Sequence, residues 1–245
     1  MKLLLMTSAM LMLSGAAGGA ASVSPTTAQV GMPVPFAAEY RLMRDGMHIA
    51  DAQFVLSRDD EDGWIFQSET KPAGVAALLL SDVIVERSSF RMGAEHPIPL
   101  SYRYEHRGSS KDHDAHYAFD WQREHIDGVY RGKPVDVALT RGTLDPLTLR
   151  LAVGLDLARG ALPTEYTVIE RRQVKQYLLT ALTPLRIRVP AGEYDVQGVA
   201  RASDDGTKTT RFLYAPALNW APVLMEQSET DEATYRLELV KFSSR

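Results

Sequence analysis

From residue 36 onward, the chain consists mostly of short segments in which apolar and polar residues alternate, separated by turn residues. Alternation with a period of two is typical of β-strands with one buried face. Asp45-Gly46 and Asp205-Gly206 each lie between two such segments and are hairpin turn signals. The pattern therefore predicts a mainly β fold, a curved antiparallel sheet or partly open barrel, with one or two short helices covering it. The strands we expect are 36–44, 47–57, 64–70, 98–107, 111–122, 185–189, 194–202, 208–214, 223–229 and 234–242.

The segments 98–107 and 111–122 form the clearest hairpin. A turn at 109–110 brings Tyr102 opposite Tyr117, and in this register the apolar residues of both strands share one face. A slip of one residue would turn this face toward water, so the pattern favours this register. The apolar residues of the shared face are Ile98, Leu100, Tyr102, Tyr104, Tyr117, Phe119 and Trp121.

Two segments have helical patterns instead. In 145–159, Asp145 is a favourable N-cap, Pro146 suits the first helical position and Gly160 suits the C-terminal end. We expect this helix to cover one face or mouth of the sheet. The Ala- and Leu-rich segment 72–80 predicts a second, short helix. The apolar stripe of the longer helix is Leu147, Leu151, Leu155 and Ala158.

The N-terminal residues follow neither pattern. Lys2, the apolar run over 3–13 and the Gly and Ala residues after it are typical of a secretory signal peptide over 1–21. Residues 22–35 are rich in Ser, Thr, Ala and Pro and predict a flexible lead-in, followed by a single domain over 36–245. No second long apolar run follows, so we expect no membrane span after cleavage and a soluble periplasmic or secreted protein.

Composition narrows the class of protein further. Hydrophobic residues make up 45% of the chain, enough for a core, and the net charge of −4 disfavours a nucleic-acid-binding protein. The chain contains no cysteine, which excludes disulfide bonds, a lipidated cysteine, a thiol nucleophile and thiolate metal ligands.

The histidines offer one candidate site. His106 and His113 should be neighbours across the hairpin, where two imidazoles could bind zinc or copper, or one could act as a base. A closed zinc site needs further ligands, which the sequence does not place nearby. We therefore favour a position at the solvent end of the hairpin.

Two acidic segments offer other candidates. Asp112 and Asp114 could orient His116 for general base catalysis in a hydrolase, but no serine lies in a Gly-x-Ser-x-Gly motif. The segment 59–63 with Glu69 resembles a calcium loop, but it lies between strands rather than helices. We therefore expect a solvated strand face and an acidic turn, with no metal and no cofactor.

Two further features indicate ligands of opposite character. Arg171, Arg172 and Lys175 could contact an anionic envelope polymer or lipid headgroup, although the exposed side of a strand is the simpler interpretation. The aromatic face of the hairpin is core if the sheet packs its own interior. If the sheet curves only partway, with the 145–159 helix as a lid, the rings could line a groove for an acyl chain or other apolar ligand. The candidate ligand-binding residues are Tyr102, Tyr104, Tyr117, Phe119 and Trp121.

Several short motifs follow one another along the domain. They are Phe-Asp-Trp at 119–121, Asp-Pro-Leu-Thr-Leu at 145–149, Val-Pro-Ala-Gly-Glu-Tyr-Asp at 189–195, Leu-Tyr-Ala-Pro at 213–216 and Trp-Ala-Pro-Val at 220–223. In order and spacing they resemble the DUF3108 family of exported bacterial proteins. The resemblance implies a mostly antiparallel β protein of unknown function and brings no catalytic residues. More loosely, it implies a curved sheet similar to that of periplasmic lipoprotein carriers.

The function we expect is that of a non-catalytic periplasmic protein that binds an amphipathic or hydrophobic ligand or an envelope component. The alternative is an envelope assembly factor that uses an exposed strand edge or loop and takes no small ligand. A hydrolase built on His116 is the least favoured hypothesis. The expected partners are a lipid-like ligand or an envelope protein, and no nucleic acid.

Overall fold

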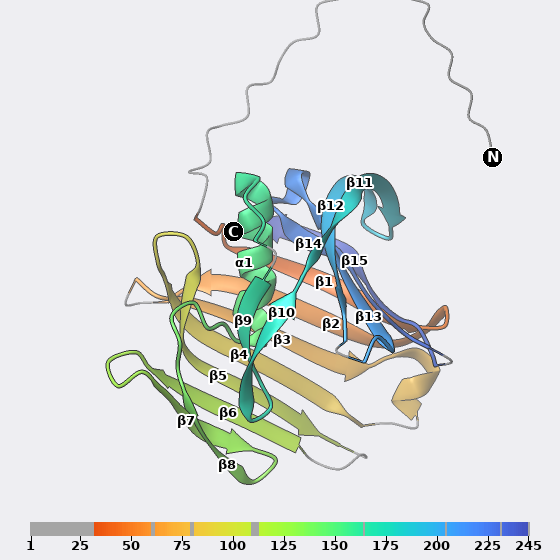
Figure 1. Cartoon of the computed structure of the whole chain (residues 1–245). Helices are drawn as coiled ribbons and strands as arrows, with labels where there is room; N and C mark the ends of the chain where they lie inside the picture. The colour runs from red at the N-terminus through yellow and green to blue at the C-terminus, as the bar shows by residue number, and fades with distance from the viewer. Residues whose placement is uncertain are drawn as a thin grey trace, which may run out of the picture.

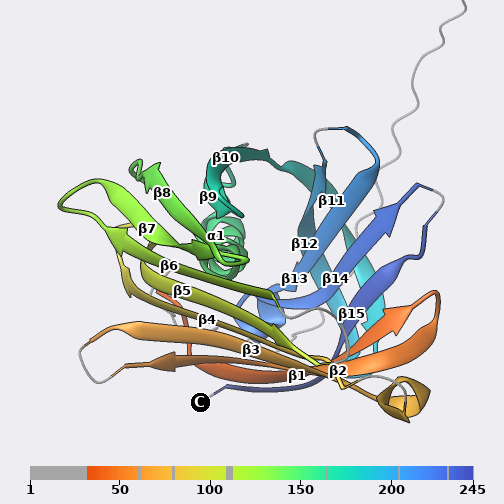
Figure 2. The same ribbon diagram turned by 90° about the horizontal axis from the view of Figure 1, so that it is seen from below.

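The computed structural model describes residues 32–59, 62–78, 81–108, 113–163, 165–203, 205–230 and 232–244. The predicted signal peptide and the turn at 109–110 lie outside the described residues. The main feature is one antiparallel sheet that bends into a half-barrel and does not close (Figures 1 and 2). Side by side, its strands are β11 (Thr180–Val189), β12 (Gly192–Ala202), β13 (Lys208–Ala215), β14 (Ala221–Glu229), β15 (Tyr235–Ser244), β1 (Phe36–Arg44), β2 (Met47–Arg58), β3 (Trp64–Pro72), β4 (Val83–Met92), β5 (Pro97–Arg107), β6 (His113–Asp120), β7 (His125–Tyr130) and β8 (Lys133–Ala138).

The predicted fold class is therefore confirmed, and so is the register of the clearest hairpin. Tyr102 pairs with Tyr117 and His106 with His113, as the alternation predicts. The prediction for Leu100 is wrong, because its side chain is 42% exposed. The pairing of β4 with β5 shifts between Ser89 and Phe90, which leaves Leu100 as an extra residue in β5. Such a bulge reverses the inside-outside alternation on one side of it.

The concave side of the half-barrel is filled by helix α1 (Pro146–Arg159) and the two-stranded hairpin β9 (Glu165–Glu170) and β10 (Gln173–Leu178). In Figure 2 the sheet curves around α1, and the hairpin lies across the open side. Strand β10 contacts both β8 and β12, which lie on opposite sides of that opening. The hairpin therefore covers the gap that the sheet leaves.

Helix α1 begins and ends as the sequence predicts. Asp145 accepts hydrogen bonds from the backbone N–H groups of Leu147 and Thr148, and Gly160 adopts a left-handed conformation at the C-terminal end. The predicted stripe accounts for only part of the buried surface, since Ala152, Val153 and Leu157 are also buried. The helix lies between the sheet and the β9–β10 hairpin, so more than one of its faces is covered.

Several elements differ from the prediction. The segment expected to be a helix over 72–80 contains a 3-10 helix, η1 (Gly74–Leu78), and residues 79–80 lie outside the described part. Five strands are absent from the prediction: β4, β7, β8, β9 and β10. In β4 the inward-facing Ser88 is polar, and it is fully buried because its Oγ donates a hydrogen bond to Asp145 Oδ2 at 2.6 Å. Strands β7 and β8 span only six residues each, and each has a single buried residue, Ile126 and Val135, so the alternation in them is short.

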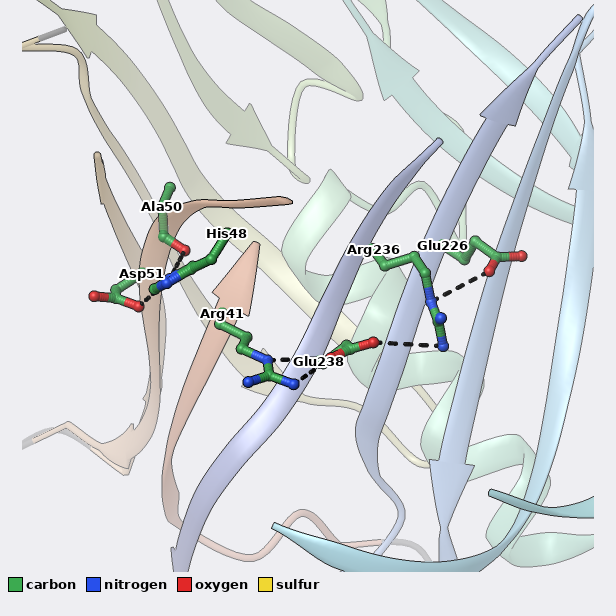
Figure 3. A network of polar contacts seen from close by, with 7 residues as sticks. All are labelled: Arg41, His48, Ala50, Asp51, Glu226, Arg236 and Glu238. Carbon is green, nitrogen blue, oxygen red and sulfur yellow. Dashed lines mark hydrogen bonds and ion pairs between the residues drawn. The ribbon is translucent and has the colours of Figure 1, made fainter. Parts of the chain in front are cut away.

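The convex face carries a network of ion pairs across three strands (Figure 3). Glu238 on β15 accepts from Arg41 on β1 at 3.1 Å and lies 3.5 Å from Arg236 on the same strand. Arg236 also lies 3.5 Å from Glu226 on β14. These contacts join the two ends of the domain, where β1 pairs with β15. Both carboxylates are mostly covered, and each has a basic partner. We therefore assign the network a structural role in holding neighbouring strands together on the outer surface.

Candidate functional site

A cavity of about 140 Å³ lies between the inner face of the sheet at β5–β7 and the β9–β10 hairpin. On the sheet side it is lined by four tyrosines and His113, and on the other side by residues of β9 and of the turn after it. The sheet-side tyrosines are Tyr102, Tyr104, Tyr117 and Tyr130, and the residues opposite them include Ile169, Glu170 and Arg171.

Strand register places the rings of this cavity in contact. Tyr102 and Tyr117 stack across β5 and β6 with ring centroids 5.8 Å apart. The His113 ring lies between Tyr104, at 5.0 Å, and Tyr130, at 5.4 Å and nearly perpendicular. Because each strand contributes alternate residues to one face, three neighbouring strands produce a continuous aromatic wall.

The His113 imidazole is the unsatisfied polar group of this wall. Its Nε2 atom is buried and has no hydrogen-bond partner among the residues that the structure describes. Burial lowers the pKa of His113, and the positive charge of Arg131 lowers it further. A neutral imidazole with one unpaired nitrogen can accept or donate one hydrogen bond, according to its tautomer. It is therefore a binding group for which the described residues supply no partner.

The hairpin is fixed over the cavity by hydrogen bonds with the sheet. The Tyr117 hydroxyl donates to the Arg171 carbonyl oxygen at 2.5 Å. Arg172 Nε donates to the carbonyl oxygen of Pro134 on β8 at 3.2 Å. Burial raises the pKa of the Tyr117 hydroxyl, so this hydroxyl stays protonated and remains a donor. These bonds set the position of the cavity wall opposite the rings.

Three of the five predicted ligand-binding residues line this cavity: Tyr102, Tyr104 and Tyr117. Phe119 is buried in the core, and the Trp121 indole packs against that core and donates to the Pro99 carbonyl oxygen at 2.6 Å. Ligand binding at any of the five stays a prediction. Tyr130 also lines the cavity and was missed, because strand β7 is not among the predicted strands.

The basic cluster occupies a different position from the one expected. Arg171 and Arg172 form the turn between β9 and β10, and only Lys175 lies on a strand. Lys175 Nζ lies 3.2 Å from Glu170 Oε2, and Arg171 contributes to the cavity lining. The structure thus brings Arg171 of the basic cluster to the aromatic face. The cluster and the aromatic face were two separate predictions.

The other candidate residues, His106, Asp114 and His116, do not line this cavity. His106 is paired with Asp82, its Nε2 lying 2.8 Å from Oδ1. Asp114 and His116 are exposed on the convex face, where they line an open pocket of about 320 Å³ together with Arg103 and Glu105. Asp114 is bound there by Arg107. Asp112 lies outside the described residues.

The acidic segment 59–63 is a turn closed by a hydrogen bond from Asp59 N–H to the Gly63 carbonyl oxygen, and residues 60–61 lie outside the described part. A separate group, which the sequence reasoning missed, consists of His125, Asp127 and Asp136, whose ligand atoms lie within 4.8 Å of one another. The His-x-Asp spacing on β7 was the available signal. Both carboxylates are exposed, and the His125 imidazole is hydrogen-bonded to Asp136. The group is therefore explained by a polar contact between two neighbouring strands on the surface.

Comparison with known proteins bears on the fold and the family. A β-barrel-like protein of domain of unknown function DUF1849 from Brucella abortus has a similar structure, with a TM-score of 0.57 and 12% identity over 86% of this chain and 98% of that chain. For a candidate lipoprotein from Parabacteroides distasonis the TM-score is 0.36 at 8% identity, over 87% of this chain and 97% of that chain. At this identity the first likeness supports the fold alone.

A search of curated proteins finds no significant match. Within the described residues, no helix is both long and apolar enough to span a bilayer. The sequence profile of DUF3108, described as a protein of unknown function, matches residues 36–240. The chain therefore belongs to the DUF3108 family.

Proposed function

We propose that this protein is an exported, non-catalytic binding protein that takes a ring or a short apolar group of a small ligand into the cavity beside His113. The observation that carries this proposal is the buried Nε2 atom without a partner in an aromatic wall. An unsatisfied buried polar atom costs about 1–3 kcal/mol, a cost that a ligand with one complementary polar group would relieve. Export is supported by the leader-like sequence over 1–21.

The size of the cavity restricts the ligand. At about 140 Å³ it is close to the volume of an apolar cavity, about 150 Å³, that holds benzene. A whole acyl chain does not fit, because α1 and the β9–β10 hairpin occupy the rest of the concave side. The ligand we favour therefore inserts one ring or a few methylene groups, and the remainder of the molecule stays outside.

The alternative, an assembly factor that adds a partner strand to the sheet, has less support. Both edge strands contain a proline, Pro134 in β8 and Pro184 in β11. Proline cannot donate a hydrogen bond to a neighbouring strand and protects sheet edges from pairing. The edges are thus poorly suited to a strand-adding partner.

The proposed function is tested by blocking the cavity. Ala115 on β6 lines it, and Ala118 on the same strand is exposed on the opposite face. Titration calorimetry of the full-chain protein with benzyl alcohol should detect binding that Ala115→Leu abolishes and Ala118→Leu preserves. Thermal unfolding of both variants confirms that each is folded.

Mass spectrometry of protein purified from cells should also identify a small ring-bearing or short-chain molecule that Ala115→Leu no longer retains. Protein that is consistently empty and does not bind the probe would contradict the proposal.

A further inference from the structure

Two tight turns place arginines beside the aromatic cavity. Arg171, in the turn between β9 and β10, lines the cavity directly. Arg131, in the turn between β7 and β8, has its guanidinium carbon 5.6 Å from the centre of the Tyr130 ring, which is part of the cavity wall. Both residues adopt left-handed backbone angles, with φ of 58° and 51°. These turns come from separate hairpins, so the two arginines are neighbours of the cavity only in the folded protein.

The positive charge around the cavity exceeds the negative charge. Glu170 is the one carboxylate among the lining residues that the structure describes. It already lies 3.2 Å from Lys175 Nζ and 3.9 Å from Arg171 Nε. Arg131 makes no ion pair with any residue that the structure describes. The full sequence, in contrast, has a net charge of −4. The region is thus basic in a chain that is acidic overall.

The nearby carboxylates that the structure describes outside the lining do not neutralise this region, because each has a basic partner of its own. Asp114 is bound by Arg107, Glu86 by Arg150 at 3.1 Å, and Asp82 by His106 at 2.8 Å. An anion near Arg131 and Arg171 would therefore meet favourable charge without displacing an existing ion pair of Arg131.

We propose that the ligand is an anionic amphiphile, whose ring or short apolar tail enters the aromatic cavity and whose carboxylate or phosphate group lies between Arg131 and Arg171. This inference rests on the proposed function and names the ligand class of the same site. The guanidinium groups provide charge-assisted hydrogen bonds to the anion. The rings of Tyr104 and Tyr130 provide the apolar surface for the tail.

The test compares probes that share a ring and differ in charge. The full-chain protein is titrated calorimetrically with phenylacetate, phenylacetamide and phenyl phosphate, at low ionic strength and at about 0.15 M salt. We expect the two anions to bind at least about tenfold more tightly than the neutral amide at low salt, with a smaller ratio at higher salt. The ratio between phenylacetate and phenyl phosphate distinguishes a carboxylate ligand from a phosphate ligand.

Arginine variants test where the anion lies. Arg131→Gln and Arg171→Gln should each reduce the ratio of anion to amide affinity by about fivefold. Arg123→Gln is the matched control, because Arg123 is an exposed arginine in the turn at the other end of β6 and β7. Ala115→Leu should abolish binding of all three probes.

The outcomes separate this inference from the proposed function. Equal binding of amide and anions, lost in Ala115→Leu, would overturn the anionic ligand and leave the cavity function standing. Anion selectivity that survives in both arginine variants, or anion binding that survives in Ala115→Leu, would overturn the assignment to this site. Absence of binding by every probe would contradict both proposals.

Discussion

Asp145 caps helix α1 with both carboxyl oxygens occupied by hydrogen bonds. Its Oδ1 atom accepts from the N–H groups of Leu147 at 2.8 Å and Thr148 at 3.0 Å, and its Oδ2 atom accepts from Ser88 Oγ at 2.6 Å. The residue is fully buried, and burial raises its pKa from 3.8 to about 6 against the opposing effect of these hydrogen bonds. A residue that the sequence identifies as a helix cap is thus also a buried acid.

The pH dependence of stability should reveal this buried acid. A carboxyl group whose pKa is higher in the folded than in the unfolded protein stabilises the fold at pH values below its unfolded-state pKa. This contribution is lost as the pH rises through the folded-state pKa. The free energy of unfolding of the wild type, relative to Asp145→Asn, should therefore fall by up to about 3 kcal/mol between pH 3.8 and just above pH 6. Urea unfolding of both proteins across this range measures the difference.

Asparagine is a suitable reference for this measurement, because it retains an acceptor for the helix N–H groups and cannot ionise. Its amide can donate to Ser88 Oγ in place of the original bond. Parallel pH profiles for the two proteins would show that Asp145 does not bind a proton more readily in the folded state.

Among the elements, helix α1 shows how packing can override helix propensity. Gly154 lies in the middle of the helix, where alanine is ordinarily about 1 kcal/mol more favourable than glycine. A Cβ atom at this position would lie 2.7 Å from the backbone carbonyl oxygen of Trp220. That carbonyl belongs to the segment after the 3-10 helix η2 (Pro216–Leu218), where the Asn219 and Trp220 backbones are left-handed. Glycine at 154 therefore allows this segment to approach the helix.

Gly154→Ala should destabilise the protein by about 1–3 kcal/mol, because the added methyl group meets backbone rather than a flexible side chain. Thermal or urea unfolding measures the change. The matched control is Ala158→Gly on the same helix, which is partly exposed and should cost about 1 kcal/mol by propensity alone. An increase in stability for Gly154→Ala would contradict the close approach.

For the whole molecule, the central feature is a sheet that curves without closing and a hairpin that covers the opening (Figure 2). The hairpin is attached on both sides. Arg172 donates to Pro134 on β8, and the Arg201 guanidinium carbon lies 3.6 Å from the centre of the Tyr177 ring, between β12 and β10. At the base of the hairpin, Leu144 exchanges backbone hydrogen bonds with β9. Widening of the cavity would therefore require loosening of the hairpin rather than of the sheet.

Tyr117→Phe should loosen the hairpin while keeping the aromatic wall. It removes the hydroxyl that donates to the Arg171 carbonyl oxygen, a loss of about 1 kcal/mol, and should speed amide hydrogen exchange in β9 and β10 by about fivefold. Tyr102→Phe is the control, because no hydrogen bond from Tyr102 to the hairpin is found in the part of the chain that the structure describes. Unchanged exchange in Tyr117→Phe would show that other contacts alone hold the hairpin.

Local patterns in the sequence determined most of the elements of this molecule. Period-two alternation predicted ten of the strands that the structure describes, Asp45-Gly46 formed a hairpin turn with φ angles of 48° and 82°, and Asp145 and Gly160 bounded the helix. These features depend on backbone geometry and on near neighbours, so one sequence suffices to predict them. The resemblance to the DUF3108 family likewise follows from sequence, and the family profile confirms the family.

Tertiary structure alone decided where polar residues enter the interior and which distant segments meet. Ser88 and Leu100 break the alternation, one because it bonds to a buried cap and the other because a bulge turns it outward. The candidate site joins rings of the sheet to arginines of two turns, contacts that span many residues of chain. Such contacts depend on the curvature of the sheet and on the position of the covering hairpin, which no local pattern of apolar and polar residues encodes.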